Sequence, residues 1–210
     1  MSHFSGAQCK RCRRLGVKLC SKGERGLGSK CALARRNYPP GVHGPKGYGR
    51  ISDYGLHLQE KQKLRVIYGI MEKQLRKYFD EAKREKTNTG LKLLELLERR
   101  FDNIIYRLGL ASSRRQARQM VGHNHFKVNG KKMNIPSYTV KRGDVISIAK
   151  EKSLSRGQIA ENIKTMAKKE IPAWLFWDEQ NKKGQVVELP QNNDLDVGVD
   201  TRLIVEFYSR

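Results

Sequence analysis

The sequence predicts an α+β protein, because three kinds of pattern follow one another along the chain. Residues 1–50 are basic and rich in cysteine and glycine, with almost no apolar run. Apolar residues of helical period follow, and short alternating segments joined by turn residues come after them. We therefore expect an N-terminal cysteine-rich arm, a helical domain, and a helix-helix-hairpin module with a small, mostly antiparallel sheet.

The balance of charge indicates a polyanionic partner. Among 210 residues, 43 are Lys or Arg and 21 are Asp or Glu, a formal net charge of +22. Since a folded chain with this excess repels itself, a polyanion is expected to neutralise it, with nucleic acid the first candidate and an anionic membrane surface the second. Residues 1–50 carry a net charge of +11 and residues 101–150 a net charge of +8, whereas residues 151–210 carry −1. We expect the last part to be scaffold rather than contact surface.

The four cysteines predict a metal site. The start of the chain, "MSHFSGAQCKRCRRLG", has no apolar signal core, and no segment has the roughly 18 consecutive apolar residues of a membrane span. A cytosolic chain is therefore expected, in which thiols stay reduced and bind metal more often than they form disulfides. The spacing is C-x2-C-x7-C-x10-C, and its leading pair has the spacing of a zinc knuckle. The predicted ligands of one zinc ion are Cys9, Cys12, Cys20 and Cys31.

Two alternatives to this ligand set stay open. The cysteines could be four free thiols in an arm without a core of its own. His43 could also replace Cys20 as a ligand if Cys20 points away. A bound metal would supply folding energy that this Gly-rich segment otherwise lacks, which favours the zinc site.

The segment 34–50, "ARRNYPPGVHGPKGYGR", is predicted to bind a phosphate backbone. Its consecutive prolines force extended backbone, and its glycines leave little to bury. We expect it to be too rich in Gly and Pro to pack on itself and to become ordered on nucleic acid. The predicted contacts of the arm are Arg13, Arg14, Arg35, Arg36, His43, Lys46 and Arg50.

Helical patterns begin at Ser52, which is a predicted N-cap, and Gly69 interrupts the first helix. Apolar stripes then run through residues 71–82 and through "LKLLELLERRFDNIIYRLG", which we expect to be one helix with Gly109 at its C-terminal cap. These stripes are expected to be core rather than a cofactor site. A polar face of the first helix is predicted to contact nucleic acid through Tyr54, Gln59, Lys61, Gln62, Arg65 and Tyr68.

The stretch "SSRRQARQMVGHNHFKVNGKKM", residues 112–133, contains no acidic residue. Ser112 or Ser113 is expected to cap a helix whose buried edge is apolar, Asn129–Gly130 to form a two-residue hairpin turn, and "TVKRGDVISI" to give a strand pair around a turn at 141–144. Because residues 101–150 contain only two acids, the arginines lack the partners of an ordinary solvated face, which favours RNA. The predicted contacts are Arg107, Arg114, Arg115, Arg118, Gln119, His123, His125, Lys127 and Lys131.

Two other function classes fit less well. Residues 153–210 predict a helix followed by strands, with Trp174 and Trp177 packed, and are too few for the catalytic domain of an RNA-modifying enzyme. A zinc-dependent DNA-binding regulator would need a short recognition helix after the cysteines, and none is predicted. Copurification would separate the classes. Stoichiometric ribosomal RNA in the purified protein would support an RNA-binding protein, whereas a modification activity would support an enzyme.

The segment "RRFDNIIYRLGLASSRRQARQMVGHNHFKVNGKKMNIPSYTVKRGDVISI" resembles the RNA-binding module named after small-subunit ribosomal protein four. "CKRCRRLGVKL", "KGER", "RRNYPPGVHG", "LQEKQKLRVIYGIMEKQLRKYF" and "IVEFYSR" resemble the bacterial family of that ribosomal protein, so the likeness runs nearly end to end. Zinc-binding members of the family place the third cysteine after "KGER", where this chain has Gly26, so Cys20 is the departure from their pattern.

The resemblance implies three regions: a zinc-knuckle arm (1–50), a helical domain (51–98) completed by the C-terminal tail (200–210), and an RNA-binding module with an appended helix and strands (99–199). It also implies a cytoplasmic, non-enzymatic ribosomal protein that binds a junction in the 5′ domain of 16S ribosomal RNA early in assembly. Such proteins line the mRNA entry side beside small-subunit ribosomal protein five and support translational accuracy. Some repress translation of their own operon.

Overall fold

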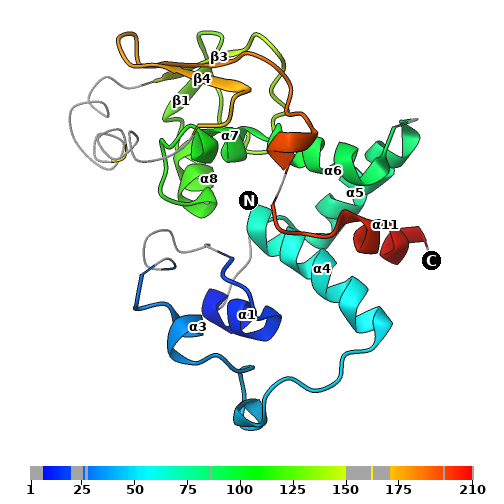
Figure 1. Cartoon of the computed structure of the whole chain (residues 1–210). Coiled ribbons are helices and arrows are strands. Elements are labelled where there is room, and N and C mark those ends of the chain that lie inside the picture. Colours follow the sequence, from blue (N-terminus) through cyan, green and yellow to red (C-terminus); the bar gives the residue numbers. More distant parts are fainter. Residues whose placement is uncertain are drawn as a thin grey trace. The chain divides into compact units, whose positions relative to one another are not determined.

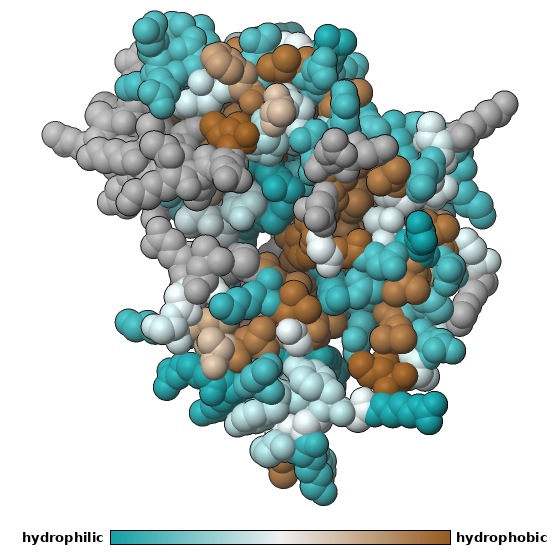
Figure 2. Space-filling model, viewed as in Figure 1, coloured by the Kyte–Doolittle hydropathy of each residue, from teal (hydrophilic) through white to brown (hydrophobic). Residues whose placement is uncertain are grey.

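The computed structural model describes residues 7–19, 26, 28–85, 87–149, 162, 171–195 and 197–209 (Figure 1). The chain divides into two compact units, Met1–Leu93 with Val197–Arg210, and Leu94–Asp196. On the face drawn in Figure 2, hydrophilic residues cover much of the surface, with apolar residues gathered between them. Within the described residues, no helix is both long enough and apolar enough to cross a lipid bilayer.

The first unit is helical. Its elements are α1 (Gln8–Leu15), α3 (Ala32–Arg35), the 3-10 turn η1 (Gly44–Lys46), α4 (Asp53–Tyr68), α5 (Glu72–Arg84), the first half of α6 (Thr89–Glu98) and α11 (Thr201–Ser209). The predicted start and end of α4 are confirmed. The Ser52 hydroxyl accepts a hydrogen bond from the Gly55 N–H at 3.3 Å, and Gly69 ends the helix with a φ of 65° that glycine adopts without strain.

The C-terminal helix α11 packs against α4 and α5, so both ends of the chain belong to the first unit. Phe79, which is buried on the predicted apolar stripe of α5, meets Tyr208 with ring centroids 4.7 Å apart. Tyr54 meets Phe207 at 5.7 Å, and the buried His57 Nε2 lies 2.9 Å from Glu206 Oε2. Aromatic burial of this kind is a large source of stability for a short terminal helix.

The single helix expected after residue 90 is two helices in the structure, α6 and α7 (Phe101–Arg107). The chain is extended at Arg100 (φ −67°, ψ 137°), where it bridges to Thr139. Two backbone hydrogen bonds hold this break: the Phe101 N–H donates to Tyr138 O at 2.9 Å, and the Val140 N–H donates to Arg99 O at 3.0 Å. The predicted glycine cap is confirmed, with Gly109 at φ 77° and a hydrogen bond from the Leu110 N–H to Ile105 O.

The second unit continues with α8 (Arg114–Gly122) and a five-stranded antiparallel sheet in the order β2-β1-β3-β5-β4. The strands are β1 (Phe126–Val128), β2 (Lys131–Lys132), β3 (Val145–Ile148), β4 (Leu175–Asp178) and β5 (Lys183–Val186), and the 3-10 turn η2 (Asn192–Leu195) follows them. Of the two predicted N-caps for α8, Ser113 is the one used, since its hydroxyl accepts from the Gln116 N–H at 3.3 Å.

The predicted hairpin turn is also confirmed, since Asn129 (φ 49°) and Gly130 (φ 80°) join β1 to β2. The strand pair expected around the turn at 141–144 is wrong: β3 follows the turn, but the preceding segment contributes only the isolated bridge at Thr139. β3 pairs instead with β1 and with the distant β5. Strands do follow in 171–186 as expected, while the predicted helix within 153–170 lies, apart from Asn162, outside the described residues.

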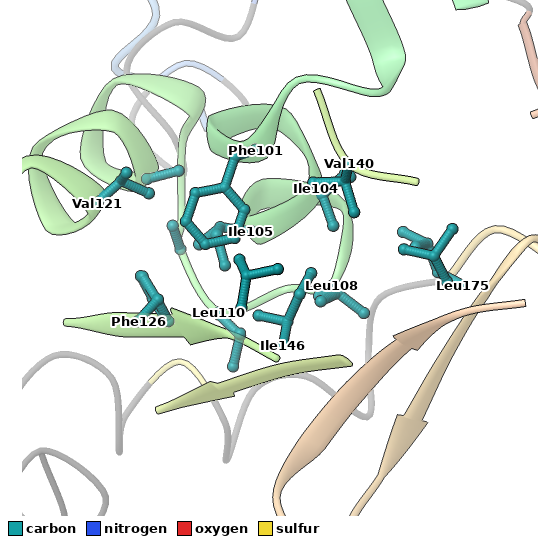
Figure 3. Close-up of a cluster of buried hydrophobic side chains, with 14 of the residues drawn as sticks. Phe101, Ile104, Ile105, Leu108, Leu110, Val121, Phe126, Val140, Ile146 and Leu175 are labelled. Atoms are coloured by element: carbon teal, nitrogen blue, oxygen red, sulfur yellow. The ribbon is translucent and has the colours of Figure 1, made fainter. Parts of the chain in front are cut away.

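The core of the second unit lies between α7, α8 and one face of the sheet (Figure 3). The predicted stripe is buried throughout: Phe101, Ile104, Ile105 and Leu108 are fully buried, and the Phe101 ring meets Phe126 edge to face at 6.3 Å. Each such side chain contributes about 1.5–3 kcal/mol by burial. Trp174 is buried and Trp177 packs at the margin of the same cluster, as expected.

Candidate nucleic-acid interface

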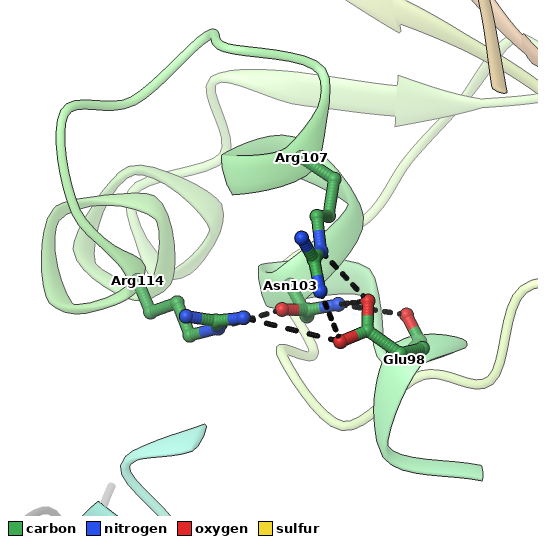
Figure 4. Close-up of polar contacts among 4 residues, drawn as sticks. All are labelled: Glu98, Asn103, Arg107 and Arg114. Atoms are coloured by element: carbon green, nitrogen blue, oxygen red, sulfur yellow. Dashed lines mark hydrogen bonds and ion pairs between the residues drawn. The ribbon is translucent and has the colours of Figure 1, made fainter. Parts of the chain in front are cut away.

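The basic residues of α7 and α8 are arranged around two buried carboxylates. Glu98, at the end of α6, is 1% exposed and accepts two hydrogen bonds from Arg107, Nε to Oε2 at 2.9 Å and Nη2 to Oε1 at 2.7 Å (Figure 4). Asn103 Nδ2 donates to the same carboxylate at 2.7 Å and to the Glu98 backbone oxygen at 3.0 Å. The paired, charge-assisted contact fixes the plane of the Arg107 guanidinium.

The arginines of α8 join the same network. Arg114 Nε donates to Asn103 Oδ1 at 2.7 Å, its Nη2 lies 3.9 Å from Glu98 Oε1, and its guanidinium stacks over the Tyr106 ring at 4.6 Å (Figure 4). We call the set Arg107, Arg114 and Arg118 the arginine cluster. Each of its side chains remains 17–24% exposed. Each guanidinium is therefore held by a buried carboxylate and still reaches the surface.

A second carboxylate holds the remaining member. Arg118 Nη1 lies 3.5 Å from Asp102 Oδ2, and the same carboxylate accepts from the fully buried Arg100 at 3.3 and 3.2 Å. As expected, the arginines of α8 have no acidic partner one turn away, but Arg114 and Arg118 find acids elsewhere in the fold, which the sequence did not predict. Their partners stand in α6 and α7 rather than one turn away within α8.

The other predicted residues of this unit lie on its surface. Arg115 and Gln119 are exposed one turn apart on α8, and the rings of His123 and His125 are 6.3 Å apart just beyond its end. Lys127 is half-buried on β1 and Lys131 is exposed on β2. The capped N-terminus of α8 adds the positive end of its helix dipole beside the arginine cluster.

The predicted arm has contacts of its own. Arg13, on α1, donates to the backbone oxygens of Tyr38 and Pro39 at 3.0 Å each and lies over the Tyr38 ring at 4.7 Å. The Tyr48 hydroxyl donates to Arg13 O at 2.5 Å. A side chain at Gly44 would meet Pro39 O at 2.0 Å, so the chain is closely packed there. The expectation that this segment is too rich in Gly and Pro to pack on itself is therefore wrong for residues 38–48.

Arg13 thus makes its hydrogen bonds within the first unit, whereas the side chains of the other predicted cations of the arm are exposed. These exposed residues are Arg14, Arg35, Arg36, His43, Lys46 and Arg50. Their density on a segment held against α1 gives a basic surface without carboxylate neighbours in the sequence of the segment.

On α4, two of the six predicted contacts are buried. Lys61 is 6% exposed, with Nζ 3.0 Å from Glu72 Oε1 and 4.2 Å over the Phe207 ring, and Tyr68 is 3% exposed. The prediction that Lys61 and Tyr68 lie on an open polar face is wrong, because both are buried, Lys61 against side chains of α5 and α11. Arg65 is held 2.9 Å from Glu72 Oε2. Tyr54 is exposed, and Gln59 and Gln62 are half-buried.

Three of the four predicted metal ligands lie in the described chain. Cys9 and Cys12 stand one turn apart on α1, and Cys31 precedes α3, which contacts α1. Burial raises the pKa of the Cys12 thiol, and the charges of Cys9 and Cys31 raise it further, whereas the Ala34 backbone N–H lowers the pKa of the Cys31 thiol. Within the described residues, no group of three His, Cys, Asp or Glu side chains is close enough to bind a metal. Cys20 lies outside the described residues.

Two features of the site were missed by sequence reasoning. Glu98 and Asp102 are acids four residues apart within a buried apolar stripe, and an acid in that position signals a buried partner. Lys132, exposed on β2, and Lys183, exposed on the alternating strand β5, were also not among the predicted contacts.

A pair of helices carrying anchored arginines, packed on a small basic sheet, defines a module that binds structured RNA. Residues 3–98 match the family described as "Ribosomal protein S4/S9 N-terminal domain", and residues 99–146 match "S4 domain". The chain is 50% identical to the small ribosomal subunit protein uS4 of Desulforamulus reducens, 51% to that of Acetivibrio thermocellus and 50% to that of Thermus thermophilus, each over 100% of both chains. The chain belongs to the uS4 family of small ribosomal subunit proteins, which are cytoplasmic ribosomal proteins and not enzymes.

Proposed function

We propose that this chain is a structural component of the small ribosomal subunit and binds 16S ribosomal RNA. The observation that carries the proposal is the arginine cluster, whose guanidiniums are held by buried Glu98 and Asp102 and still reach the surface. A fixed, planar set of N–H donors suits phosphate, because little side-chain freedom is lost on binding. Structured RNA is recognised largely through its shape and backbone, which such donors can follow.

The finer role follows from likeness to the family over the whole chain. The chain binds a junction in the 5′ domain of 16S RNA as a primary binder and helps to initiate assembly. It lines the mRNA entry side with small-subunit ribosomal protein five and supports translational accuracy there. Repression of its own operon is a further possibility that the family offers.

The contact residues proposed here are the predicted ones that the structure leaves at the surface. Lys61 and Tyr68 are excluded because they are buried, and Arg13 serves inside the first unit. The contacts are Arg14, Arg35, Arg36, His43, Lys46, Arg50, Tyr54, Gln59, Gln62, Arg65, Arg107, Arg114, Arg115, Arg118, Gln119, His123, His125, Lys127 and Lys131.

A zinc ion held by Cys9, Cys12, Cys20 and Cys31 also stays part of the proposal. The placement of three thiols supports it, because Cys9 and Cys12 stand one turn apart on α1 and Cys31 precedes α3, which contacts α1. Elemental analysis of the purified full chain should find about one zinc per chain, lost in Cys12→Ser. Protein purified without chelator and free of metal would contradict the site.

RNA binding by the full chain tests the main proposal. The 16S 5′-domain RNA should be bound more tightly than an unrelated structured RNA of equal length, by roughly a hundredfold or more. Arg115→Ala removes an exposed cation without touching the buried carboxylates, and it should lower the slope of log affinity against log salt by about 0.7–0.9. Equal affinity for the two RNAs would contradict the proposed function.

A further inference from the structure

The outer face of the sheet carries a line of lysines that crosses the strands. Register pairs Lys132 with Lys127, Lys127 with Ser147, Ser147 with Lys183 and Lys183 with Asp178. Directly paired residues of antiparallel strands project to the same side of a sheet. Phe126 and Val128, the neighbours of Lys127, are buried in the core, so the row points away from it. We call Lys132, Lys127 and Lys183 the lysine row.

No described helix of the second unit covers this face. The helices α7 and α8 lie on the opposite side of the sheet, where the core is (Figure 1). Exposure along the strands agrees: both residues of β2 are exposed, and β5 alternates between exposed Lys183 and Gln185 and buried Gly184 and Val186.

The lysines of the row are poorly neutralised. Lys127 and Lys132 stand opposite each other on neighbouring strands, and like charges in that position destabilise a sheet. The side chain of neither makes an ion pair or hydrogen bond with another residue in the part of the chain that the structure describes. Lys183, at the other end of the row, faces Asp178. Two lysines that face each other without an acidic neighbour indicate that an anionic partner neutralises them when it binds.

The spacing and neighbours of the row fit a nucleic-acid backbone. Adjacent strands are about 4.8 Å apart, so the row places cations at intervals of about 5 and 10 Å along a line. The Ser147 hydroxyl between them can donate to a phosphate oxygen. Phe176 is 55% exposed and pairs with Gln185 in the next row, which puts an aromatic ring and an amide near Lys183, at one end of the lysine row. An exposed aromatic ring near a lysine can stack an unpaired base.

We propose that the outer face of the sheet is a second RNA-binding surface, in which Lys132, Lys127 and Lys183 hold the sugar-phosphate backbone and Phe176 stacks a base. The inference rests on the proposed function, since it assigns further contacts to the same RNA-binding unit. Its chemistry differs from that of the arginine cluster: Lys127 and Lys132 have no carboxylate that fixes their geometry among the described residues, and the binding energy comes from releasing counter-ions.

The experiment compares two triple variants of the full chain that lose the same charge. The test variant is Lys127→Gln/Lys132→Gln/Lys183→Gln, and the control is Lys73→Gln/Lys77→Gln/Lys83→Gln, three exposed lysines of α5. For the 16S 5′-domain RNA, the test variant should lose about two units of the log–log salt slope and bind roughly tenfold or more weakly in 0.1 M salt. The control should lose less than one unit. Equal losses would overturn the proposal, because net charge alone would explain them.

A second measurement locates the contact on wild-type protein. Acetylation by a lysine-reactive reagent, read by mass spectrometry, should slow on RNA addition at Lys127, Lys132 and Lys183 but not at the α5 lysines. Unchanged rates at Lys132 and Lys183 in a saturated complex would overturn the proposal, and protection only by an acidic protein would assign the face to that partner instead.

A different measurement tests the proposed function. If that function is wrong, the wild-type chain should bind 16S RNA and unrelated RNA with equal affinity. Protection of the row can still be read with either RNA.

Discussion

The arginine cluster and the lysine row are both basic surfaces of the second unit, but they treat their charge in opposite ways. Arg107, Arg114 and Arg118 stand on buried carboxylates, and their orientation is set by hydrogen bonds of 2.7–2.9 Å at Arg107 and Arg114. Lys127 and Lys132 face each other, and neither side chain pairs with an acid among the residues that the structure describes. The arginine cluster therefore offers a ligand donors of fixed orientation whose charge is partly neutralised. The lysine row offers a ligand positive charge whose orientation no carboxylate fixes.

The two surfaces also destabilise the fold by different mechanisms. Burying Glu98 requires desolvation that the ion pairs only partly offset, so its value lies mainly in placing the arginines. The row costs a repulsion that disappears when a polyanion binds. Substitutions in the two regions should therefore change stability and RNA binding in different proportions.

The largest effect is expected at Glu98. Glu98→Ala leaves Arg107 and Asn103 without their shared acceptor inside the fold, and the free energy of unfolding should fall by about 3 kcal/mol, measured by urea denaturation. The matched control is Glu95→Ala on the same helix, where the ion pair with Arg99 at 3.0 Å lies one turn away and should be worth only about 0.5 kcal/mol. Equal losses in the two variants would show that the carboxylate of Glu98 has no special role.

Local determinants of the fold could be predicted from the sequence. The caps at Ser52, Ser113 and Gly109 and the Asn129–Gly130 turn depend on residues within a few positions of one another, and all are confirmed. The buried stripes of α5 and α7 follow from helical period alone.

What failed depended on contacts between distant segments. The break at Arg100 is made by the backbone of residues 138–140, which no helical pattern reveals. Lys61 is buried by α11, some 140 positions later in the chain. The acids that hold the arginines stand in other helices, so a search for partners one turn away could not find them.

A smaller effect is expected from Arg107→Lys. A lysine keeps the charge but has no planar pair of donors, so one of the two hydrogen bonds to Glu98 is lost, and the free energy of unfolding should fall by about 1–2 kcal/mol. In the row, the reverse change Lys127→Arg should alter stability by less than about 0.5 kcal/mol. Both values can be read from urea midpoints. A neutral Arg107→Lys would show that the cluster, like the row, needs only charge.

Glu72 extends the comparison to a carboxylate that is less buried than Glu98. It accepts from Lys61 Nζ at 3.0 Å and from the Tyr208 hydroxyl at 2.7 Å, and its side chain is 40% exposed. Burial alone would raise its pKa, but the hydrogen bonds from Tyr208 and Lys61 hold the pKa below the usual value. A lowered pKa means that this contribution to stability is complete above the unfolded-state pKa and is lost as pH falls through the folded-state pKa.

The protection factors of the α11 amides, which compare observed exchange with the intrinsic rate at the same pH, should therefore fall on acidification below about pH 4.5. The Glu72→Gln variant should show weaker protection of α11 already at pH 7 and a smaller further loss in acid. A variant with the acid dependence of the wild type would show that another group controls the docking of this helix.

The smallest effect, and the one of opposite sign, is expected in the lysine row. Lys132→Gln removes one of two cations that face each other across β1 and β2, so the free energy of unfolding should rise by a few tenths of a kcal/mol in low salt, roughly 0.3. Salt screens exposed charges, so the gain should vanish near 0.5 M salt. The control Lys183→Gln removes a lysine that faces Asp178 and should give no such gain. Thermal denaturation at two salt concentrations measures both variants. A stability gain joined to weaker RNA binding is the mark of a residue kept for a partner, whereas a loss of stability in Lys132→Gln would show that the lysine serves the fold itself.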